Sequence, residues 1–340
     1  MNFLSDTTAP AHPALLDAMA HANGGYAASY GNDPICQRVE DHLKQVFETE
    51  LKVLFTVSGT ASNALALSIL CPSHGAVLCH DEAHIHRDER GAPEFFTGGA
   101  KLIPLPGAHA KIDLEALKAT LNSWPQDFVH TTPPRALSVS NLNESGCAYS
   151  ADELAALTAP ARARGLGIHF DGARFANLLA GSGMTPAQAS WKAGADILSL
   201  GATKNGALAA EAVILFPSVM NRYGELQARQ KRAGHMVAKM RYVAAQFDAW
   251  LADNLWLDLA EHANEMAKRL SEGLSAIDGV RLAHPVDGNE IFVTLPEPVA
   301  ERMRAGGAGF YQWPDGSARF VTSWSTREDD VLALLEAASG

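Results

Sequence analysis

The sequence contains few cysteines, and no two of them form a short motif. Its 340 residues include four, Cys36, Cys71, Cys79 and Cys147, and none belongs to a Cys-x-x-Cys pair. A chain of this length can bury a sizeable apolar core, so it does not need disulfide bonds for stability. We therefore expect four reduced thiols and a cytoplasmic protein.

Long apolar runs and an excess of basic residues are also missing. The most apolar stretch, Leu54–Leu70, is interrupted by Thr56, Ser58, Thr60 and further polar residues, so it cannot span a membrane. The first residues lack the basic segment and apolar segment of a signal peptide. The formal net charge is −11, which argues against nucleic acid and anionic membranes as main partners because both are polyanions.

Short apolar runs alternate with helix-like segments through the first 216 residues. This spacing predicts a mainly parallel sheet with helices on both faces, and several runs are almost wholly apolar, as buried parallel strands are. The predicted strands are Val53–Phe55, Ala76–His80, Lys101–Leu105, Ala136–Ser140, Gly167–Phe170, Ile197–Leu200 and Ala212–Phe216. The predicted helices are Ala61–Leu70, Asp113–Trp124, Ser150–Arg164 and Thr185–Ala193.

The pattern changes after Phe216. Residues 218–274 are rich in Ala, Leu, Met, Lys, Arg and Glu, which predicts long helices. Four short strand-like runs and a final helix then predict a small α+β domain; they are Val280–Ala283, Glu290–Leu295, Phe310–Trp313, Arg319–Thr322 and Glu328–Ala337. We predict a large domain of residues 1–248 and a small one of residues 249–340, with a boundary inside a helix.

Lys204 is the most unusual residue of the predicted sheet. It lies in the segment Ser199-Leu-Gly-Ala-Thr-Lys204-Asn-Gly, a glycine-rich turn directly after a buried strand. A lysine held in a dry site has a lowered pKa, which makes it a nucleophile for aldehydes. A loop lysine that reaches solvent is the alternative, and this segment alone does not exclude it.

Asp171 provides the context for Lys204. It follows the strand Gly167–Phe170, and in open α/β sheets ligands bind at the carboxyl ends of the strands. A carboxylate at this place can keep a pyridine nitrogen protonated. Asp171 could also cap the helix-like segment Ala173–Leu179, and the two roles are compatible. Arg174 follows one turn later and is expected near the same site.

Ser58, Gly59 and Thr60 precede a predicted helix. Free N–H groups at the start of a helix bind phosphate, helped by the helix dipole. Gly59 would allow close approach of the backbone, and Thr60 adds a hydroxyl. The same tripeptide is also a common capping sequence, and its spacing is not that of a nucleotide P-loop.

The segment His80-Asp-Glu-Ala-His84-Ile-His86 offers several metal-ligand side chains. His84 and His86 lie on opposite sides of an extended chain, and the sequence suggests no further His or Cys partner for them. We therefore expect no metal there. Stacking of one histidine on a flat cofactor is the favoured interpretation.

Taken together, these segments resemble the L-threonine aldolase family. The matching motifs extend over nearly the whole chain in the family order, and several in register are far more specific than one. They are Leu4-Ser5-Asp6, Ser29-Tyr30-Gly31-Asn32-Asp33-Pro34, Ser58-Gly59-Thr60, Ala83-His84-Ile85, Asp171-Gly172-Ala173-Arg174, Thr203-Lys204 and Arg319-Phe320-Val321-Thr322. Three further stretches look like the phenylserine aldolase branch: residues 91–96, 201–206 and 231–235.

The resemblance implies a fold-type I pyridoxal-phosphate enzyme of the β-eliminating lyase superfamily. It implies retro-aldol cleavage of an L-β-hydroxy-α-amino acid to glycine and an aldehyde, in tetramers built from catalytic dimers. For the cofactor it implies a Schiff base on Lys204, Asp171 at the pyridine nitrogen, His84 stacked on the ring, and Ser58, Gly59, Thr60 and Arg232 at the phosphate. For the substrate it implies Ser5, Arg174 and Arg319 at the carboxylate, Arg174 also near the cofactor, and Tyr30 at the site of its own chain or across the dimer.

The segment Ser140-Asn141-Leu142-Asn143 departs from the family pattern, because many threonine aldolases carry Glu-Asn-Thr-His there. The family histidine lies close to the substrate hydroxyl, so Asn143 leaves the general base open, with His84 or a water as candidates. We expect more room beside the substrate Cβ, an apolar wall at Leu142 and aryl-substituted substrates. A low-specificity L-threonine aldolase proper is one alternative. Others are a β-eliminating lyase or racemase, and a non-catalytic binding protein, against which Lys204 and Asp171 together argue.

Overall fold

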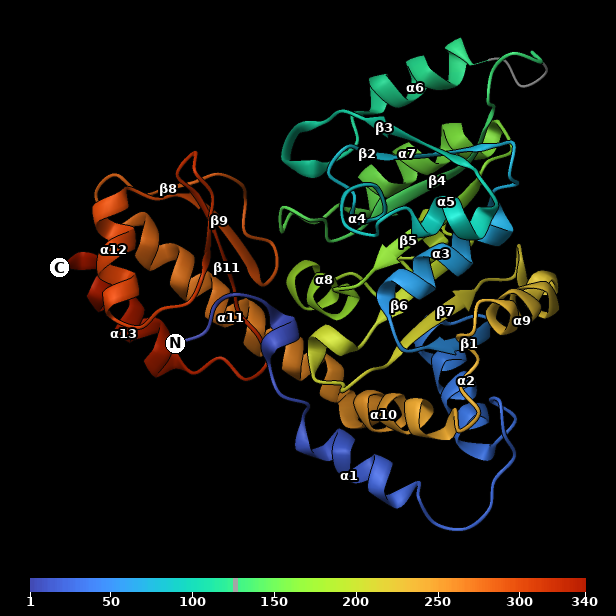
Figure 1. Cartoon of the computed structure of the whole chain (residues 1–340), viewed down its shortest axis with the longest axis horizontal. Helices are drawn as coiled ribbons and strands as arrows, with labels where there is room; N and C mark the ends of the chain where they lie inside the picture. The colour runs from blue at the N-terminus through green and yellow to red at the C-terminus, as the bar shows by residue number, and fades with distance from the viewer. Residues whose placement is uncertain (125–127) are drawn as a thin grey trace.

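The computed structural model describes residues 1–124 and 128–340. Its centre is a seven-stranded sheet in the order β1-β7-β6-β5-β4-β2-β3 (Figure 1). Strands β3, β2, β4, β5 and β6 pair in parallel, whereas β7 pairs antiparallel with both β6 and β1. The strands are β1 (Lys52–Thr56), β2 (Ala76–His80), β3 (Lys101–Leu105), β4 (Pro134–Ser140), β5 (Gly167–Gly172), β6 (Ile197–Gly201) and β7 (Glu211–Leu215). The predicted mainly parallel sheet is confirmed.

Both faces of this sheet are covered by helices, which explains the nearly continuous apolar character of its strands. Along β7, Ile214 packs into the core on one face, whereas Val213 and Leu215 pack into the core on the other. Helices α2, α6, α7, α8 and α10 supply the first core, and α3 and α9 supply the second. The sheet is therefore the middle layer of three.

The helices of this part, which we call the main lobe, are α1 (Pro13–His21), α2 (Pro34–Phe47), α3 (Gly59–Leu70), α4 (His84–Arg87), α5 (Ala92–Thr97), α6 (Leu114–Ser123), α7 (Ala151–Ala163), α8 (Phe175–Ser182), α9 (Tyr223–Arg232) and α10 (Arg241–Leu251). Several begin at a side-chain cap, as Ser150 and Glu153 form a reciprocal capping box at α7. No helix in the described part of the chain combines the length and apolar character needed to cross a bilayer.

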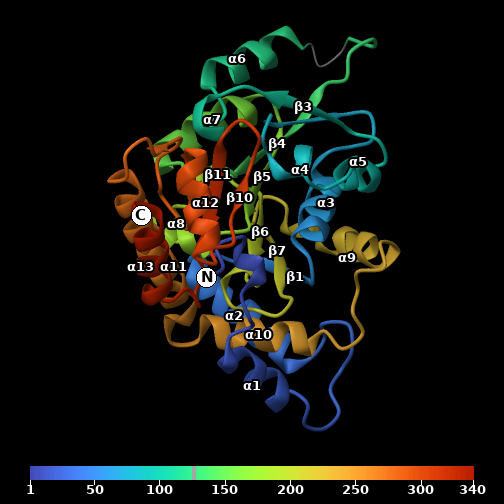
Figure 2. The same ribbon diagram turned by 60° about the vertical axis from the view of Figure 1, so that its left-hand side comes forward.

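The C-terminal lobe has a second, antiparallel sheet in the order β10-β11-β9-β8. Its elements are α11 (Leu255–Ser275), β8 (Arg281–Leu282), β9 (Glu290–Thr294), α12 (Glu297–Ala305), β10 (Tyr311–Gln312), β11 (Ser317–Val321) and α13 (Glu328–Ser339). Leu270, Ile291 and Phe320 lie in its separate apolar core, and Phe3 from the N-terminus joins them. The N-terminus therefore lies against this lobe (Figures 1 and 2).

The predicted limit between residues 248 and 249 falls inside α10, and the chain turns a few residues later. There a short 3-10 turn, Ala252–Asn254, separates α10 from α11, and Asp253 and Asn254 both have positive φ. Positive φ breaks a right-handed helix. The division into two domains at this limit remains a prediction.

The predicted helix Thr185–Ala193 is wrong. The structure has turns over residues 186–190, followed by one 3-10 turn at Trp191–Ala193. Ser190 has φ −136° and ψ −106°, which is incompatible with a helix. The ring nitrogen of Trp191 donates to the Phe47 carbonyl at 2.7 Å, so a tertiary contact overrides local helix preference.

Candidate active site

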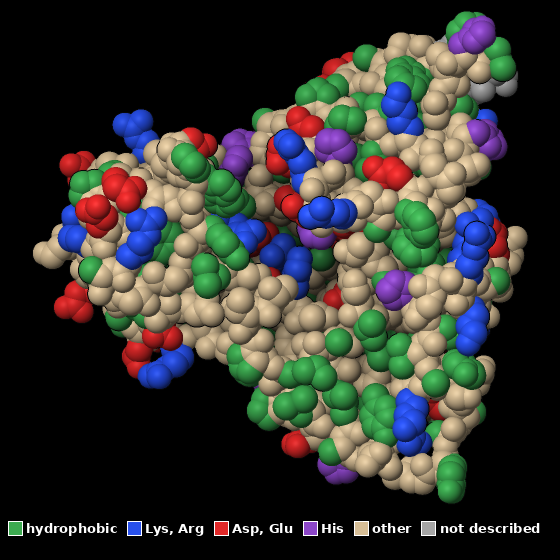
Figure 3. Space-filling view, in the orientation of Figure 1, with side chains coloured by type: hydrophobic (Ala, Val, Ile, Leu, Met, Phe, Trp, Pro, Cys, Tyr) green, Lys and Arg blue, Asp and Glu red, His purple; other side chains and the backbone are tan. Residues whose placement is uncertain are grey.

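One pocket lies beside the carboxyl ends of β4, β5 and β6 and the first turn of α3. In the space-filling view, charged side chains gather in the hollow between the two lobes (Figure 3). The pocket is lined by Thr7, Val57, Ser58, Gly59, Thr60, Asn63, His84, Glu89, Ser140, Leu142, Asn143, Glu144, Asp171, Ala173, Arg174, Ser199, Thr203, Lys204 and Glu211. The sheet thus brings the predicted Lys204, Asp171, His84, Arg174 and Ser58–Thr60 together.

Lys204 lies in a short 3-10 turn, Thr203–Asn205, that directly follows β6. Its side chain lines the pocket and the residue is half-buried. The Nζ atom makes no hydrogen bond or ion pair with any residue in the described ranges 1–124 and 128–340. By contrast Lys192, on the surface, pairs with Glu48 at 2.6 Å. The Lys204 side chain therefore lines the pocket without being held by another described residue.

Asp171 lies near the end of β5 and is 6% exposed. Its Oδ2 accepts from Asn63 Nδ2 at 2.8 Å and its Oδ1 accepts from the Ala173 N–H at 3.0 Å. The N-cap of α8 is Arg174, so Asp171 does not cap that helix, and this alternative is wrong. These two donors fix the orientation of the Asp171 carboxylate.

His84 stands at the start of α4, opposite a buried carboxylate. Its Nδ1 lies 2.9 Å from Glu89 Oε1, and its side chain is 39% exposed. The hydrogen bond to Glu89 raises the pKa of His84. Burial raises the pKa of Glu89 itself. Because Nδ1 faces Glu89, the other ring nitrogen of His84 is left to exchange a proton.

The neighbouring histidines of the same segment point to other partners. His80 Nε2 lies 3.2 Å from the Gly107 carbonyl oxygen, and His86 Nδ1 lies 2.9 Å from the Asp81 carbonyl oxygen. The three rings therefore do not converge on one point. Stacking of His84 on a flat cofactor remains a prediction.

The first turn of α3 presents its backbone to the pocket. Ser58 is the N-cap, and its Oγ accepts from the Ala61 N–H at 3.4 Å. A Cβ added at Gly59 would meet no atom within 4 Å, so there is open space directly at the helix start. The N–H groups at a helix start and the positive end of the helix dipole favour binding of an anion.

Arg174 is held between two buried carboxylates. Its Nε and Nη2 donate to Asp6 at 2.8 and 3.2 Å, and its Nη1 lies 2.9 Å from Glu290 Oε2. Burial raises the pKa of Asp6, but Arg174 and Lys204 outweigh it, so the net pKa lies below its usual value. Glu290 also lies 3.9 Å from Arg319 Nη1, so one carboxylate joins both arginines.

Four predicted residues do not line the pocket: Ser5, Tyr30, Arg232 and Arg319. Ser5 bonds Thr7, which does line it, at 2.8 Å. Arg319 lies 3.9 Å from Glu290, which in turn pairs with the pocket residue Arg174. Tyr30 is exposed, beneath Lys231 Nζ at 4.7 Å from the ring centroid, and Arg232 is exposed at the end of α9.

Four polar residues of the pocket were not predicted from the sequence: Asn63, Glu89, Glu144 and Glu211. Asn63 bridges Asp171 and Glu89, and Glu144 accepts from Ser140 Oγ at 2.7 Å and from the His84 N–H at 2.8 Å. Glu211 opens β7, and burial raises its pKa to about 7. The sequence did carry a signal for two of them, because Asn63 lies inside the apolar α3 and Glu211 precedes an apolar strand. A polar residue in such a place is expected to have a hydrogen-bonding or functional role.

The comparisons with known proteins agree with this geometry. A family model described as Beta-eliminating lyase matches residues 2–298. The low specificity L-threonine aldolase of Pseudomonas aeruginosa is 40% identical over 333 residues, covering 98% of this chain and 95% of that protein. The enzyme of the same name from Pseudomonas sp. is 39% identical over 333 residues, with the same coverage of both chains.

A solved structure, that of Leishmania major threonine aldolase, has a TM-score of 0.92 and 29% sequence identity. The match covers 99% of this chain and 98% of that one, so both lobes correspond. The resemblance drawn from the motifs and the fold-type I architecture are therefore confirmed. The chain belongs to the β-eliminating lyase family, whose enzymes depend on pyridoxal phosphate, and within that family it groups with the threonine aldolases.

Proposed function

We propose that this chain is a carbon–carbon lyase that cleaves L-β-hydroxy-α-amino acids to glycine and an aldehyde with pyridoxal phosphate. We further propose that it prefers an aryl group on Cβ, as in phenylserine, over the methyl group of threonine. The observation that carries the activity is the 40% identity to a low specificity L-threonine aldolase over 98% of the chain. The L configuration follows from that relationship.

The residues of the pocket fit pyridoxal phosphate. Lys204 offers an amine without a partner among the described residues, as an aldehyde requires. Asp171 offers a buried carboxylate, as a protonated pyridine nitrogen requires. Gly59 and Thr60 offer open space and backbone N–H groups at a helix start, as a phosphate requires. When bound, the cofactor supplies an electron sink for the electrons of the broken Cα–Cβ bond.

The substrate carboxylate is assigned to the arginines joined by Glu290. Arg174 already uses Nε, Nη1 and Nη2 toward Asp6 and Glu290, so it has limited capacity left. Arg319 bonds the Leu4 carbonyl oxygen at 3.3 Å, and its Nε is buried without a partner among the described residues. An unpaired buried donor favours an anionic ligand. Arg319 is therefore assigned as the main hydrogen-bond donor to the substrate carboxylate, with Arg174 and Ser5 beside it.

His84 is assigned as the base that removes the β-hydroxyl proton, directly or through a water. With its Nδ1 proton directed at Glu89, Nε2 carries the lone pair that accepts a proton. Glu89 then stabilises the charged imidazole. The same ring lies at the pocket edge where it can stack on a flat ligand.

The aryl preference is supported by the wall of the pocket at Leu142 and Asn143. Leu142 is 5% exposed and adds apolar surface. Asn143 is 1% exposed, and its side chain bonds the His109 carbonyl oxygen at 2.9 Å and the N–H groups of Ser145 and Cys147 at 3.0 and 3.1 Å. Asn143 is therefore turned toward its own loop and leaves the space beside Cβ to apolar groups.

The proposal also includes the assembly and the location: a homo-oligomer built as a dimer of dimers, in the cytoplasm. Tyr30 and Arg232 lie away from the pocket of their own chain, so their proposed roles at the substrate and phosphate require a second copy. The four unpaired cysteines support a reducing compartment. Sedimentation velocity of the purified chain tests the oligomer.

Product analysis tests the activity. The purified chain with pyridoxal phosphate should convert L-phenylserine and L-threonine to glycine and the matching aldehyde in equal amounts. Lys204→Ala is the inactive control, because it removes the amine that would bind the cofactor aldehyde. Formation of a 2-oxo acid and ammonia without glycine would mean that the chain catalyses β-elimination instead.

A further inference from the structure

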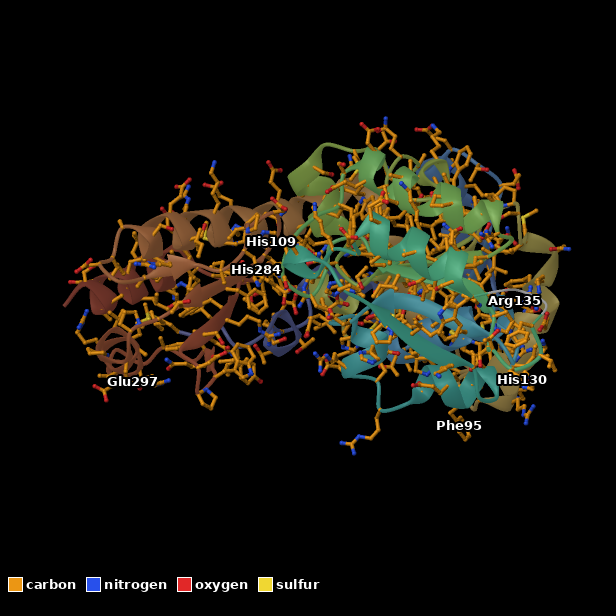
Figure 4. The ribbon with its side chains drawn as sticks, turned by 90° about the horizontal axis from the view of Figure 1, so that it is seen from above. Phe95, His109, His130, Arg135, His284 and Glu297 are labelled. Carbon is orange, nitrogen blue, oxygen red and sulfur yellow. The ribbon has the colours of Figure 1, made fainter. Side chains whose placement is uncertain are left out.

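His109, Cys147 and His284 meet where the main lobe adjoins the C-terminal lobe, as the two labelled histidines in Figure 4 show. Nδ1 of His109 lies 3.0 Å from Nδ1 of His284. One nitrogen of each imidazole and the Cys147 sulfur all lie within 4.8 Å of one another. Cys147 is buried, His284 is half-buried and His109 is exposed, so the cluster opens to solvent on one side.

Hydrogen bonds that do not use the ligand atoms hold His109 and Cys147 in place. Asn143 Nδ2 donates to the His109 carbonyl oxygen at 2.9 Å, while Asn143 Oδ1 accepts from the Cys147 N–H at 3.1 Å. The Ile112 N–H donates to Tyr149 Oη at 2.5 Å, which joins the same two loops a second time. The backbone of two of the three residues is therefore held in place before any ligand binds.

The third segment is fixed to the second in the same way. Asp287 Oδ2 accepts from the Ala148 N–H at 3.0 Å, and the Asp287 N–H donates to the Gly146 carbonyl oxygen at 3.2 Å. The His284 ring packs edge-on against Phe292, with centroids 5.7 Å apart. Such support of the ligand side chains is what a metal site needs, because second-shell contacts orient the ligands.

The backbone at His109 is unusual as well. His109 and Ala110 have φ of 56° and 55°, the left-handed region that residues with a Cβ seldom occupy. At the start of this loop, a Cβ on Gly107 would lie 1.6 Å from the Lys111 carbonyl oxygen. Strained backbone of this kind persists where the surroundings hold it, often at ligand sites.

We infer that His109, Cys147 and His284 form a binding site for Zn²⁺ that joins the two lobes at the edge of the active-site pocket. One thiolate and two imidazoles are ligands that zinc prefers, and three protein ligands leave a fourth position for water. Tetrahedral zinc bonds of about 2.0–2.3 Å place ligand atoms a few ångströms apart, which the cluster meets with small side-chain rotations. On binding, the Cys147 thiol releases its proton to solvent.

Zinc at this site would stabilise the pocket wall. Asn143 lines the pocket and also bonds the segments of His109 and Cys147. A metal that fixes these segments to His284 fixes the loop of Asn143 as well. The site is separate from the cofactor residues, so metal binding can be measured without reference to activity.

Metal binding to the full chain loaded with pyridoxal phosphate tests the inference. After treatment with EDTA and gel filtration, titration with zinc chloride should give one tight site per chain and a higher thermal midpoint. Cobalt chloride should give visible absorption of tetrahedral cobalt at wavelengths longer than those of the cofactor. Cys147→Ser and His284→Ala should each abolish the tight site and the rise in thermal midpoint.

Cys71→Ser and His74→Ala are the matched controls, a buried cysteine and an exposed histidine away from the cluster. Both should keep one zinc per chain. Absence of a tight site in the wild-type chain would overturn the inference, and so would retention of zinc by Cys147→Ser and His284→Ala. Should one of these variants not fold without metal, the other and the wild-type cobalt spectrum decide.

Discussion

Glu89 and Asp171 are joined by a single amide, because Asn63 Nδ2 lies 2.8 Å from an oxygen of each. Asp171 is the residue assigned to the cofactor ring, and Glu89 bonds His84, the residue assigned to the β-hydroxyl proton. The residue assigned to the cofactor ring and the residue assigned to the β-hydroxyl proton are therefore connected by one buried series of hydrogen bonds. The hydrogen bond to Glu89 and the charges of Asp171 and Glu89 raise the pKa of His84.

Glu89→Gln should move the acidic limb of the pH–rate profile to lower pH. The hydrogen bond to Glu89 raises the pKa of His84, and neutral His84 is the form that accepts a proton. Removing the charge lowers that pKa, so kcat/KM reaches its plateau at a lower pH than in the wild type. Glu115→Gln, an exposed carboxylate at 78%, is the control and should leave the profile unchanged. An unmoved limb in Glu89→Gln would exclude His84 as the titrating base.

Asp6→Ala should destabilise the chain strongly, because it leaves the Arg174 charge buried with one partner fewer. Removal of one member of a buried pair costs about 3–5 kcal/mol. The folded-state pKa of Asp6 is lowered, so its stabilisation exists above its unfolded-state pKa and is lost as the pH falls through the folded-state pKa. Denaturant unfolding at neutral and acidic pH measures both effects.

The exposed pair Arg327–Asp329, with side chains 71% and 78% exposed, provides the comparison. Asp329→Ala should cost less than about 1 kcal/mol. Equal losses in the two variants would mean that the Asp6–Arg174 pair contributes no more than a surface pair.

Arg319→Ala should lower both binding and turnover while the cofactor stays bound. A lost contact to a desolvated carboxylate costs about 2–5 kcal/mol. Steady-state kinetics with L-phenylserine measure substrate binding and turnover, and the cofactor absorbance shows whether the cofactor stays bound. Arg327→Ala is a control on the same lobe. If Arg319→Ala has the same kinetics as the wild type, Arg174 alone binds the substrate carboxylate.

Leu142→Ala should reduce the ratio of kcat/KM for L-phenylserine over L-threonine. Burial of about 100 Å² of aryl surface is worth about 2.5 kcal/mol, or about 70-fold in rate, and loss of this wall removes part of it. Asn143→His is a poorer test, because it would also break the three loop hydrogen bonds of Asn143. An unchanged ratio in Leu142→Ala, or a preference of the wild type for threonine, would contradict the proposed aryl preference. The chain would then be a low-specificity L-threonine aldolase.

Residues next to strand ends could be predicted from the sequence, whereas contacts between distant segments could not. Lys204 and Asp171 follow buried strands, and the parallel sheet necessarily brings such positions to one edge. The Asn63–Glu89 contact depends on how α3 packs on the loop after α4, which no local pattern records. The helix predicted over Thr185–Ala193 failed for a related reason, since Trp191 is anchored to Phe47, far away in the chain.

The most direct test of the account is to locate the lysine that binds the cofactor. Borohydride reduction of the protein loaded with pyridoxal phosphate, followed by peptide mapping, reports it. No residue among those described (1–124 and 128–340) pairs with the Lys204 amine in the pocket, whereas Lys192 is held by Glu48 on the surface. We expect the label on Lys204 and its loss in Lys204→Ala. A label on Lys192 or another surface lysine, with Lys204 unmodified, would contradict it.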